Sequence, residues 1–345
     1  MGAEHHYLDA VEAFDKGDFE LAFDQAKAAT KLDPEHVDAW VLYSDSALAG
    51  ETKNPTLAQA AKSLNGCRKA IELDPMLLQM WVRGGQLLSD NLGLLDDSLQ
   101  WWQDCRHHAP DEVTPIVEQA TILTDMGLYG EADTRLKSIV ENNMEIATSQ
   151  TGKLYYLMNL VKAAAEGTSG TYFYPWEKNH DGWGAITSKM RKPPVSETFI
   201  FMMATMPFLL LEVVLSDKIF GEGWGGFCLT SIVIFITVLV GMRLAKRWTG
   251  LLNKPAYNLL RAMNFEASTG FTIIDEDIRL SVLYLYIMQR KPIAWQERMI
   301  KIIDSGKELP KGWKPQLPDF DSHLDEMGYI DEEYEEEQLE QFEEE

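Results

Sequence analysis

Few side chains in this 345-residue chain are suited to catalysis or metal binding, and their spacing favours neither. His5-His6 and His107-His108 are adjacent pairs, and neighbouring residues on a helix point in different directions, so neither pair forms a two-ligand metal site. Cys67 and Cys105 fall at apolar helix positions, where we expect small buried thiols. The sequence contains no G-x-x-x-x-G-K-[ST], G-x-S-x-G or H-E-x-x-H motif. We therefore predict no enzymatic activity, no metal site and no cofactor.

The composition narrows the classes of partner. The chain has 54 acidic and 31 basic residues, a formal net charge of −23 and a pI near 4.7. Phosphate binding requires clustered Lys and Arg, so nucleic acid is not expected as a partner. The hydrophobic content of 46% supports a folded core, and three Cys are too few for a disulfide framework.

The charge is unevenly distributed along the chain. Residues 1–197 are acidic, residues 198–315 are slightly basic, and residues 316–345 hold 14 acidic residues with no Lys or Arg. This segregation predicts several regions of different chemistry rather than one uniformly acidic domain.

An internal repeat occupies the first two-fifths of the chain. Three fragments recur near the expected helix ends: Lys31-Leu32-Asp33-Pro34, Glu72-Leu73-Asp74-Pro75 and His108-Ala109-Pro110. A second pattern has constant offsets from a glycine: Gly17-x-Phe19-x-x-Ala22, Gly93-x-Leu95-x-x-Ser98 and Gly127-x-Tyr129-x-x-Ala132. The small residues Ala22 and Ser98 should allow two helices to approach closely. Extra residues over 50–55 should lengthen one turn.

These fragments resemble the tetratricopeptide repeat, a helix–turn–helix unit of about 34 residues. The resemblance covers roughly residues 3–146 and implies about four helix pairs stacked into a right-handed solenoid, because no pair can bury its apolar face alone. Residues 147–166 read as a closing helix over the last pair. The first domain is therefore expected over residues 1–166.

The resemblance also implies a groove, lined by the first helix of each pair, that binds a protein or peptide partner. Mapped onto this chain, the groove positions are Tyr7, Val11, Phe14, Val41, Asp45, Leu48, Val82, Arg83, Gln86, Val117, Thr121 and Thr124. An alternative is that several of them pack beneath neighbouring loops. The carboxylate clamp of some family members is missing, since Arg83 is the one matching cation. We therefore expect a mixed apolar and polar ligand.

Two apolar runs predict a transmembrane helical hairpin within residues 198–244. Phe199–Leu215 and Trp224–Met242 are separated by a short polar turn, and the second run, with no charged residue, would span roughly 28 Å of a bilayer core about 30 Å thick. Seven Lys and Arg lie just before the first run or just after the second, whereas the turn between the runs has one, Lys218. By the positive-inside rule both termini are cytoplasmic, and the chain is a multi-pass protein of the cell membrane.

Individual residues in the hairpin suggest further roles. Glu212 is an intramembrane carboxylate near the outer end, so a snorkelling or structural role competes with a functional one. Pro207 should kink the first span, and Trp224 and Trp248 should lie at the interfaces. Small residues give the second span a face suited to close helix packing: Gly225, Gly226, Thr230, Ser231 and Thr237.

The remaining segments are less distinctive. Residues 167–197 form a linker, either at the headgroup surface or packed on the repeat domain. Residues 245–310 should form a cytoplasmic helical region with helices over 255–265, 275–288 and 293–304, which would pack on the repeat domain. Residues 311–345 form an acidic tail expected to be disordered, in which Tyr334, Leu339 and Phe342 could anchor a basic partner.

The predicted fold class is thus all-α. The leading functional hypothesis is a membrane-anchored interaction scaffold with its groove in the cytoplasm. The alternative is an integral subunit or assembly factor of a larger membrane complex, held through the hairpin, in a homo- or hetero-oligomer. A third reading, a soluble protein with a buried core hairpin, requires both apolar runs to be buried.

Overall fold

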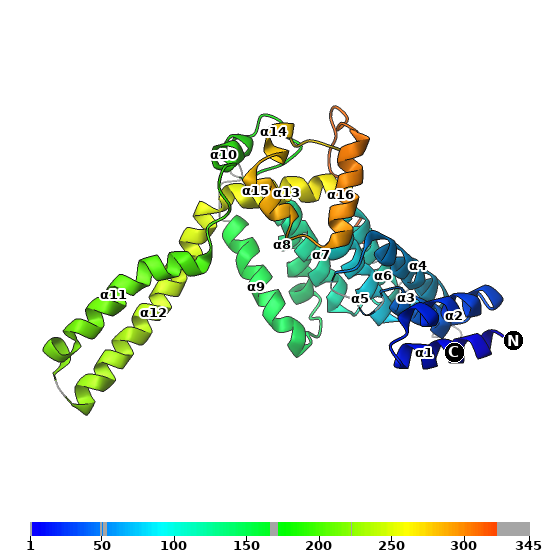
Figure 1. The fold of residues 1–345 in the computed structure, drawn as a ribbon, viewed down its shortest axis with the longest axis horizontal. Helices are drawn as coiled ribbons and strands as arrows, with labels where there is room; N and C mark the ends of the chain where they lie inside the picture. The colour runs from blue at the N-terminus through cyan, green and yellow to red at the C-terminus, as the bar shows by residue number, and fades with distance from the viewer. Residues whose placement is uncertain (1, 49, 51–53, 166–171, 222, 323–345) are drawn as a thin grey trace, which may run out of the picture. The chain divides into compact units, whose positions relative to one another are not determined.

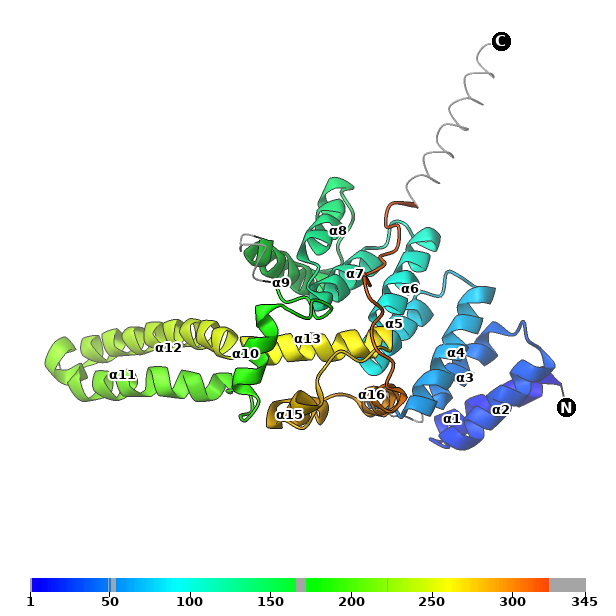
Figure 2. The same cartoon turned by 90° about the horizontal axis from the view of Figure 1, so that it is seen from above.

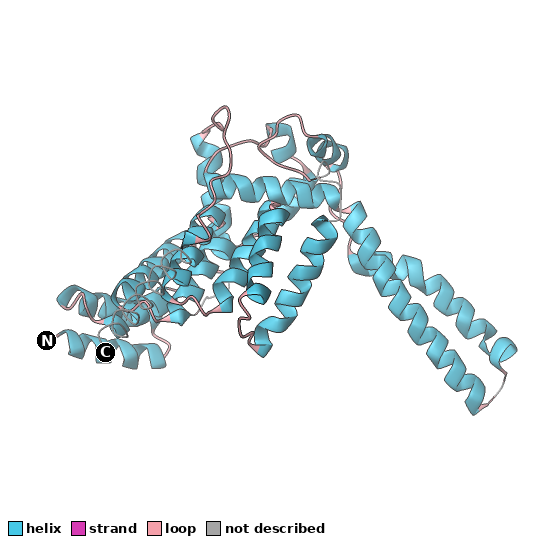
Figure 3. Cartoon of the chain, turned by 180° about the vertical axis from the view of Figure 1, so that it is seen from behind, coloured by secondary structure: helices cyan, strands magenta, loops and turns pink. Residues whose placement is uncertain are grey.

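The computed structural model describes residues 2–48, 50, 54–165, 172–221 and 223–322. Within these ranges every regular element is a helix, and the one β-type contact is an isolated bridge between Thr272 and Glu308 (Figure 3). The predicted all-α class is therefore confirmed. The last part of the acidic tail, including its three apolar anchors, lies outside the described residues.

The first 165 residues form a series of consecutive helices, which we call the helical array (Figure 1). Each helix packs on the next, and α9 packs on both α7 and α8. The array comprises α1 (Ala3–Asp15), α2 (Phe19–Leu32), α3 (Val37–Ala47), α4 (Leu57–Leu73), α5 (Leu78–Gln86), the π-helix η1 (Leu87–Leu92), α6 (Leu95–His108), α7 (Val113–Met126), α8 (Tyr129–Glu141) and α9 (Thr148–Ala165).

The recurring glycines end the first helix of three pairs. Gly17, Gly93 and Gly127 have φ of 77°, 69° and 84°, in the left-handed region that favours glycine because it lacks a Cβ. The three small residues at the shared offset, Ala22, Ser98 and Ala132, are fully buried. The sequence spacing therefore marks the turn within each pair.

The junctions between pairs also repeat in detail. Asp33 and Asp74 end α2 and α4 with nearly equal backbone angles, φ −135° and ψ 94° against φ −136° and ψ 93°. The indole Nε1 of Trp40 donates to the Pro34 carbonyl over 2.8 Å, and that of Trp81 donates to the Pro75 carbonyl over 2.9 Å. Because both bonds span six residues, the two junctions are equivalent local structures.

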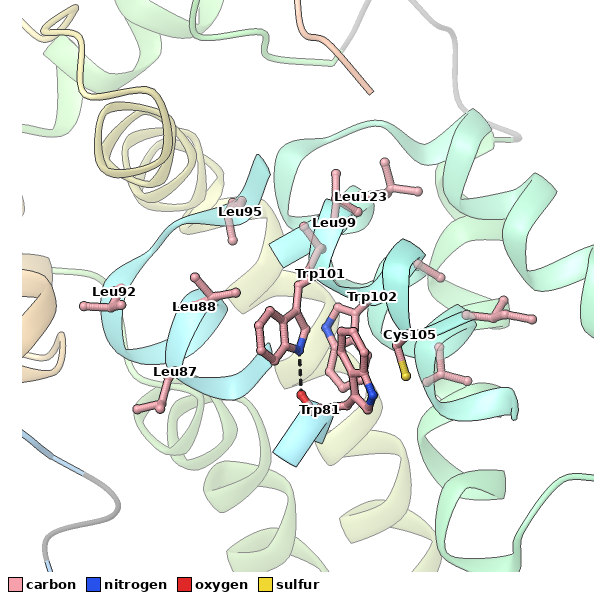
Figure 4. Close-up of a cluster of buried hydrophobic side chains, with 14 of the residues drawn as sticks. Trp81, Leu87, Leu88, Leu92, Leu95, Leu99, Trp101, Trp102, Cys105 and Leu123 are labelled. Carbon is pink, nitrogen blue, oxygen red and sulfur yellow. Dashed lines mark hydrogen bonds between the residues drawn. The ribbon is translucent and has the colours of Figure 1, made fainter. Parts of the chain in front are cut away.

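Tryptophan and leucine side chains fill the core of the later helices (Figure 4). Trp102 is 2% exposed, and the buried Trp101 indole donates to the Trp81 carbonyl over 2.8 Å. Gly84 and Gly85 in α5 make room for these rings, since a Cβ on either would overlap an indole. Cys67 and Cys105 are fully buried, as predicted.

Two segments that follow the apolar helices return to the array; we call residues 261–273 and 290–322 the return segments. They belong to the same compact unit as residues 1–176. They include the second part of α13 (Lys254–Thr269) and all of α16 (Ile293–Ser305), which packs on α4 and η1. The compact unit is therefore larger than the predicted boundary at residue 166.

The return segments contact three turns of the array, each between the two helices of a pair. At the first turn, Ala294 N donates to the Pro55 carbonyl over 3.1 Å. At the second, Ser268 Oγ donates to Asp96 Oδ2 over 2.8 Å. At the third, Arg261 Nη2 donates to the Tyr129 hydroxyl over 2.8 Å. The expected packing on the array of the helices that follow the apolar hairpin is confirmed for these segments.

The second compact unit comprises residues 177–260 and 274–289. Its helices are α10 (Asp181–Lys189), α11 (Glu197–Phe220), α12 (Trp224–Leu252), the first part of α13, α14 (Glu276–Arg279) and α15 (Val282–Met288). The predicted single helix over 275–288 is two helices, because Ser281 ends one and its Oγ accepts from Tyr284 N over 3.1 Å to begin the next.

Helices α11 and α12 run side by side as a hairpin (Figure 2). Two stretches, Glu197–Leu215 and Trp224–Leu252, are long and apolar enough to cross a membrane, and only 6% of the most apolar window of each is buried. This exposure does not fit a hairpin buried in a protein core. Helix α11 runs through Pro207, and α12 extends ten residues beyond the predicted end at Met242.

Candidate partner-binding surfaces

The predicted groove residues lie on the first helices of successive pairs, except Leu48, which directly follows α3. Most of those on α1, α3 and α5 are at least partly exposed: Tyr7, Val11, Phe14, Val41, Asp45, Val82, Arg83 and Gln86. Thr121 on α7 is also partly exposed, although its Oγ1 is bonded to the Val117 carbonyl over 2.7 Å. We call the eight partly exposed residues on α1, α3 and α5 the first-helix surface.

Three predicted groove residues are instead part of the core. Leu48, Val117 and Thr124 are 3%, 2% and 7% exposed, so a ligand has no access to them. Helix α7 packs on α6, α8 and α9, which leaves little of its surface free. Leu48 follows the last turn of α3 and packs in the main hydrophobic cluster. The prediction that these three line a groove is therefore wrong.

Asp45 and Arg83 form an ion pair between α3 and α5 within the first-helix surface. Arg83 Nη1 also lies 3.5 Å from Ser44 Oγ and 3.9 Å from Met80 Sδ. Burial raises the pKa of the Asp45 carboxyl, and the Arg83 charge opposes this rise. The pair places one carboxylate and one guanidinium, each about 30% exposed, where a ligand can meet both.

Aromatic and acidic side chains form the end of this surface on α1. The Tyr7 and His36 rings lie 4.7 Å apart, and His36 Nε2 lies 3.4 Å from Glu4 Oε2. Burial, followed by the negative charges of Asp38 and Glu4, raises the pKa of the Tyr7 hydroxyl. Tyr7 is therefore a neutral hydrogen-bonding group at physiological pH.

A second site involves residues that sequence reasoning did not identify. Arg106 of α6 and Arg135 of α8 are 2% and 4% exposed, and both donate through Nη1 to the Phe320 carbonyl, over 3.4 and 3.2 Å. Arg135 Nη2 donates to Asp321 Oδ1 over 2.7 Å. We call Arg106 and Arg135 the arginine cradle. They lie 214 and 185 residues from Phe320 in sequence, so no motif links them.

Amide side chains extend the arginine cradle. Gln119 Nε2 of α7 donates to Gln103 Oε1 of α6 over 3.1 Å, and Gln103 Nε2 donates to Ser322 Oγ over 3.4 Å. An open cavity of about 800 Å³ borders Arg106, between the turn over 110–112 and the turn over 142–147. The cradle is thus a polar site on the otherwise apolar packing of α6, α7 and α8.

The hairpin has its own polar contacts. Glu212 of α11 accepts a hydrogen bond from Thr237 Oγ1 of α12. Thr205 lies against Gly241, where a Cβ would overlap its hydroxyl. Both contacts join the two helices, which favours the structural role of Glu212. Trp224 and Trp248 are 83% and 45% exposed, near the two ends of α12.

Across the described ranges, no group of three or more His, Cys, Asp or Glu side chains is arranged to hold a metal ion. Comparison of the whole chain with known proteins found no matching protein-family model and no significantly similar curated protein.

Proposed function

We propose that this chain is a membrane-anchored adaptor whose first-helix surface binds a segment of a protein partner. The observation that carries the proposal is the part-exposed surface on α1, α3 and α5, where apolar side chains surround the Asp45–Arg83 ion pair. Apolar anchors supply binding free energy, and the ion pair sets orientation and specificity. A ligand of mixed apolar and polar character fits this surface.

The array itself is proposed to be a tetratricopeptide-type solenoid. Left-handed glycines at three turns support it, as do the equivalent junction bonds of Trp40 and Trp81. In such a solenoid each pair contacts only its neighbours, so the first helices present one extended surface.

The proposed location is the cell membrane, with α11 and α12 as its two spans and both termini in the cytoplasm. The low burial of both apolar helices supports a lipid environment. The excess of Lys and Arg before α11 and after α12, relative to the turn between them, supports this orientation. The array would then meet its partner on the cytoplasmic side.

The test is co-purification of partners with the full chain from native membranes after crosslinking. The variant carries Val41→Asp and Val82→Asp, which place two carboxylates on the first-helix surface. The matched control carries Leu73→Asp and Val140→Asp, at exposed apolar positions on α4 and α8. We expect the first variant to lose the partner and the control to retain it. Retention of every partner by the first variant would refute the proposal.

A second candidate, an integral subunit of a larger membrane complex, is favoured by the small-residue face of α12. Gly225 and Ser231 are exposed, and the space where a Gly225 Cβ would lie is open. Such a face allows close approach of a partner helix. Replacing residues 197–252 with an unrelated two-span hairpin separates the candidates, because complex assembly is lost only if the native hairpin makes the main contact.

A further inference from the structure

The contact between the arginine cradle and residues 317–322 is asymmetric in burial. Both guanidinium-bearing side chains are almost fully buried, whereas the side chain of Asp321 is 67% exposed. Residues 314–319 have no regular secondary structure. Buried guanidinium groups need acceptors, because leaving their N–H groups unsatisfied is costly. In the folded chain, the Phe320 carbonyl and the Asp321 carboxylate supply acceptors to this pair of arginines.

The charge of the cradle selects for an anionic ligand. Burial, followed by the charge of the neighbouring Arg135, lowers the pKa of Arg106 to about 10, although the charge of Asp321 opposes both effects. Two guanidinium groups held together in a poorly hydrated site repel each other, and a carboxylate next to them relieves that repulsion. A neutral segment would leave the repulsion uncompensated.

The remaining contacts define what the cradle recognises. The Arg135 guanidinium lies 4.8 Å from the centroid of the Phe320 ring, at the distance of a cation–π contact. The next residue, Asp321, supplies the carboxylate, and the carbonyl of Phe320 is main chain and therefore common to any peptide. Leu317 packs on the main hydrophobic cluster three residues earlier. The arginine cradle therefore recognises an aromatic residue directly followed by an acidic residue in an extended segment.

We propose that the arginine cradle is a second peptide-binding site of the array, specific for an aromatic–acidic dipeptide in a partner protein, and that Phe320-Asp321 is its built-in competing ligand. This site is separate from the first-helix surface and does not depend on the adaptor function proposed above. The open cavity beside Arg106 gives a longer partner segment room that the chain's own segment leaves unfilled.

The two ligands can exchange because Asp321 meets the cradle from the solvent side. Water competes for the exposed carboxylate, which weakens its ion pair with Arg135. The built-in segment gains from its covalent attachment, which gives it an effective concentration on the order of millimolar. A partner segment must therefore bind better than this segment or reach the site at high local concentration.

The test uses the full chain in detergent micelles and a fluorescent synthetic peptide with the sequence of residues 314–322. The opened variant carries Phe320→Ala and Asp321→Asn, which removes the competing side chains. The matched control carries Lys314→Ala and Gln316→Ala, at exposed positions of the same segment. We expect the opened variant to bind the peptide at least about tenfold more tightly than the wild type, and the control to bind like the wild type.

Peptide variants provide an independent readout that changes no residue of the protein. Peptides with Ala in place of the Phe, or Asn in place of the Asp, should bind the opened variant at least about fivefold more weakly, because each loses one recognised group. Adding Arg135→Met to the opened variant should abolish the preference for the intact peptide. The proposal is overturned if the opened variant gains no affinity over the control, or if all peptides bind it equally.

Discussion

The two ends of the array bury different kinds of side chain. Helices α1, α2 and α3 pack on one another largely through alanine, since Ala10, Ala22 and Ala26 are fully buried. The helices from α5 to α8 bury large side chains, including Trp102, Leu99 and Ile116. Because stabilisation scales with the apolar area removed from water, each contact at the first end contributes less than each contact at the second.

The two ends also differ in what covers them. Contacts of the return segments with the array include Pro55, Asp96, Tyr129 and Arg135. The first-helix surface on α1 and α3 precedes all of these positions in sequence. We call α5 to α8, together with the return segments that contact the array, the reinforced base. We call α1 to α3 the early end, whose stability depends on neighbouring helices alone. We infer that local opening occurs first at the early end, which carries the α1 and α3 part of the first-helix surface.

The largest expected difference between the ends concerns two equivalent glycines. Gly93→Ala must place a Cβ at φ 69°, and that Cβ would also overlap the buried Trp295 ring of α16. Gly17→Ala has a similar φ of 77° but open space around the Cβ. We expect both to lose about 1 to 2 kcal/mol from left-handed strain, and Gly93→Ala to lose about 1 to 3 kcal/mol more from overpacking.

Thermal unfolding of the detergent-solubilised chain, followed by circular dichroism, measures this difference. The control compares the double variant Gly93→Ala, Trp295→Ala with Trp295→Ala alone, because both lack the ring and therefore its overlap with the new Cβ, so their difference should fall to that of Gly17→Ala. If Gly17→Ala and Gly93→Ala lowered the unfolding midpoint equally, the return segments would not reinforce this turn.

These glycines also show how much of the fold was predictable. The constant offsets from Gly17, Gly93 and Gly127 predict the helix pairs from spacing alone. This works because a left-handed turn at the glycine and a small residue five positions later are both local requirements of the pair. The two apolar helices were equally predictable, since each is a continuous apolar run in the sequence. The return segments were only expected to pack somewhere on the array. Their partners, such as Ser268 for Asp96, lie 172 residues away, beyond any periodicity.

The second prediction tests a polar contact of the reinforced base. Ser268 Oγ donates to Asp96 Oδ2 over 2.8 Å and accepts from Asp96 N over 3.0 Å. Ser268→Ala removes both bonds and leaves a largely buried carboxylate short of a donor, so we expect a loss of about 1 to 3 kcal/mol in the free energy of unfolding. Thr134→Ala, an exposed hydroxyl bonded to its own helix, is the control and should change little. An equal loss in both variants would contradict the reinforcement.

The candidate sites were less predictable than the fold. Mapping by repeat position put Asp45 and Arg83 in one predicted groove, and the structure joins them in an ion pair because they lie at neighbouring positions on first helices. The mapping also placed Val117 and Thr124 on the surface, because an offset within one helix does not report how many other helices cover it. No sequence pattern predicts the arginine cradle, since its two arginines lie on different helices and form a site only together with a segment far away in the sequence.

The third prediction compares two buried thiols of the main hydrophobic cluster: Cys67 on α4, next to the early helices, and Cys105 on α6. Cys67 lies 3.3 Å from Ser44 Oγ of α3, so separation of α3 from α4 exposes it, whereas Cys105 lies on a later helix. Burial raises the pKa of both thiols, that of Cys105 to about 12, so neither reacts in the folded state. We expect Cys67 to be labelled at least about tenfold faster through local opening. A maleimide time course with Cys228→Ala, which removes the exposed third thiol, measures both rates. Faster labelling of Cys105 would reverse the assignment of the stable end.

The smallest expected effect concerns a buried cation in the base. Lys291 Nζ donates to Asn264 Oδ1 over 2.8 Å, and burial lowers the pKa of Lys291 below its usual 10.5, although Asp125 and Asp90 oppose this. Between the folded pKa and 10.5 the unfolded chain binds more protons than the folded chain at this residue, so stability must rise as pH rises through this window. The stability of the wild type relative to Lys291→Met should therefore increase as the pH rises toward 10.5, because the variant has no such group. Comparing the two proteins at each pH cancels the titration of all other residues. If the difference in free energy of unfolding stayed constant with pH, Lys291 would be as well solvated in the folded chain as in the unfolded one. Water would then reach the reinforced base at a position where the structure excludes it.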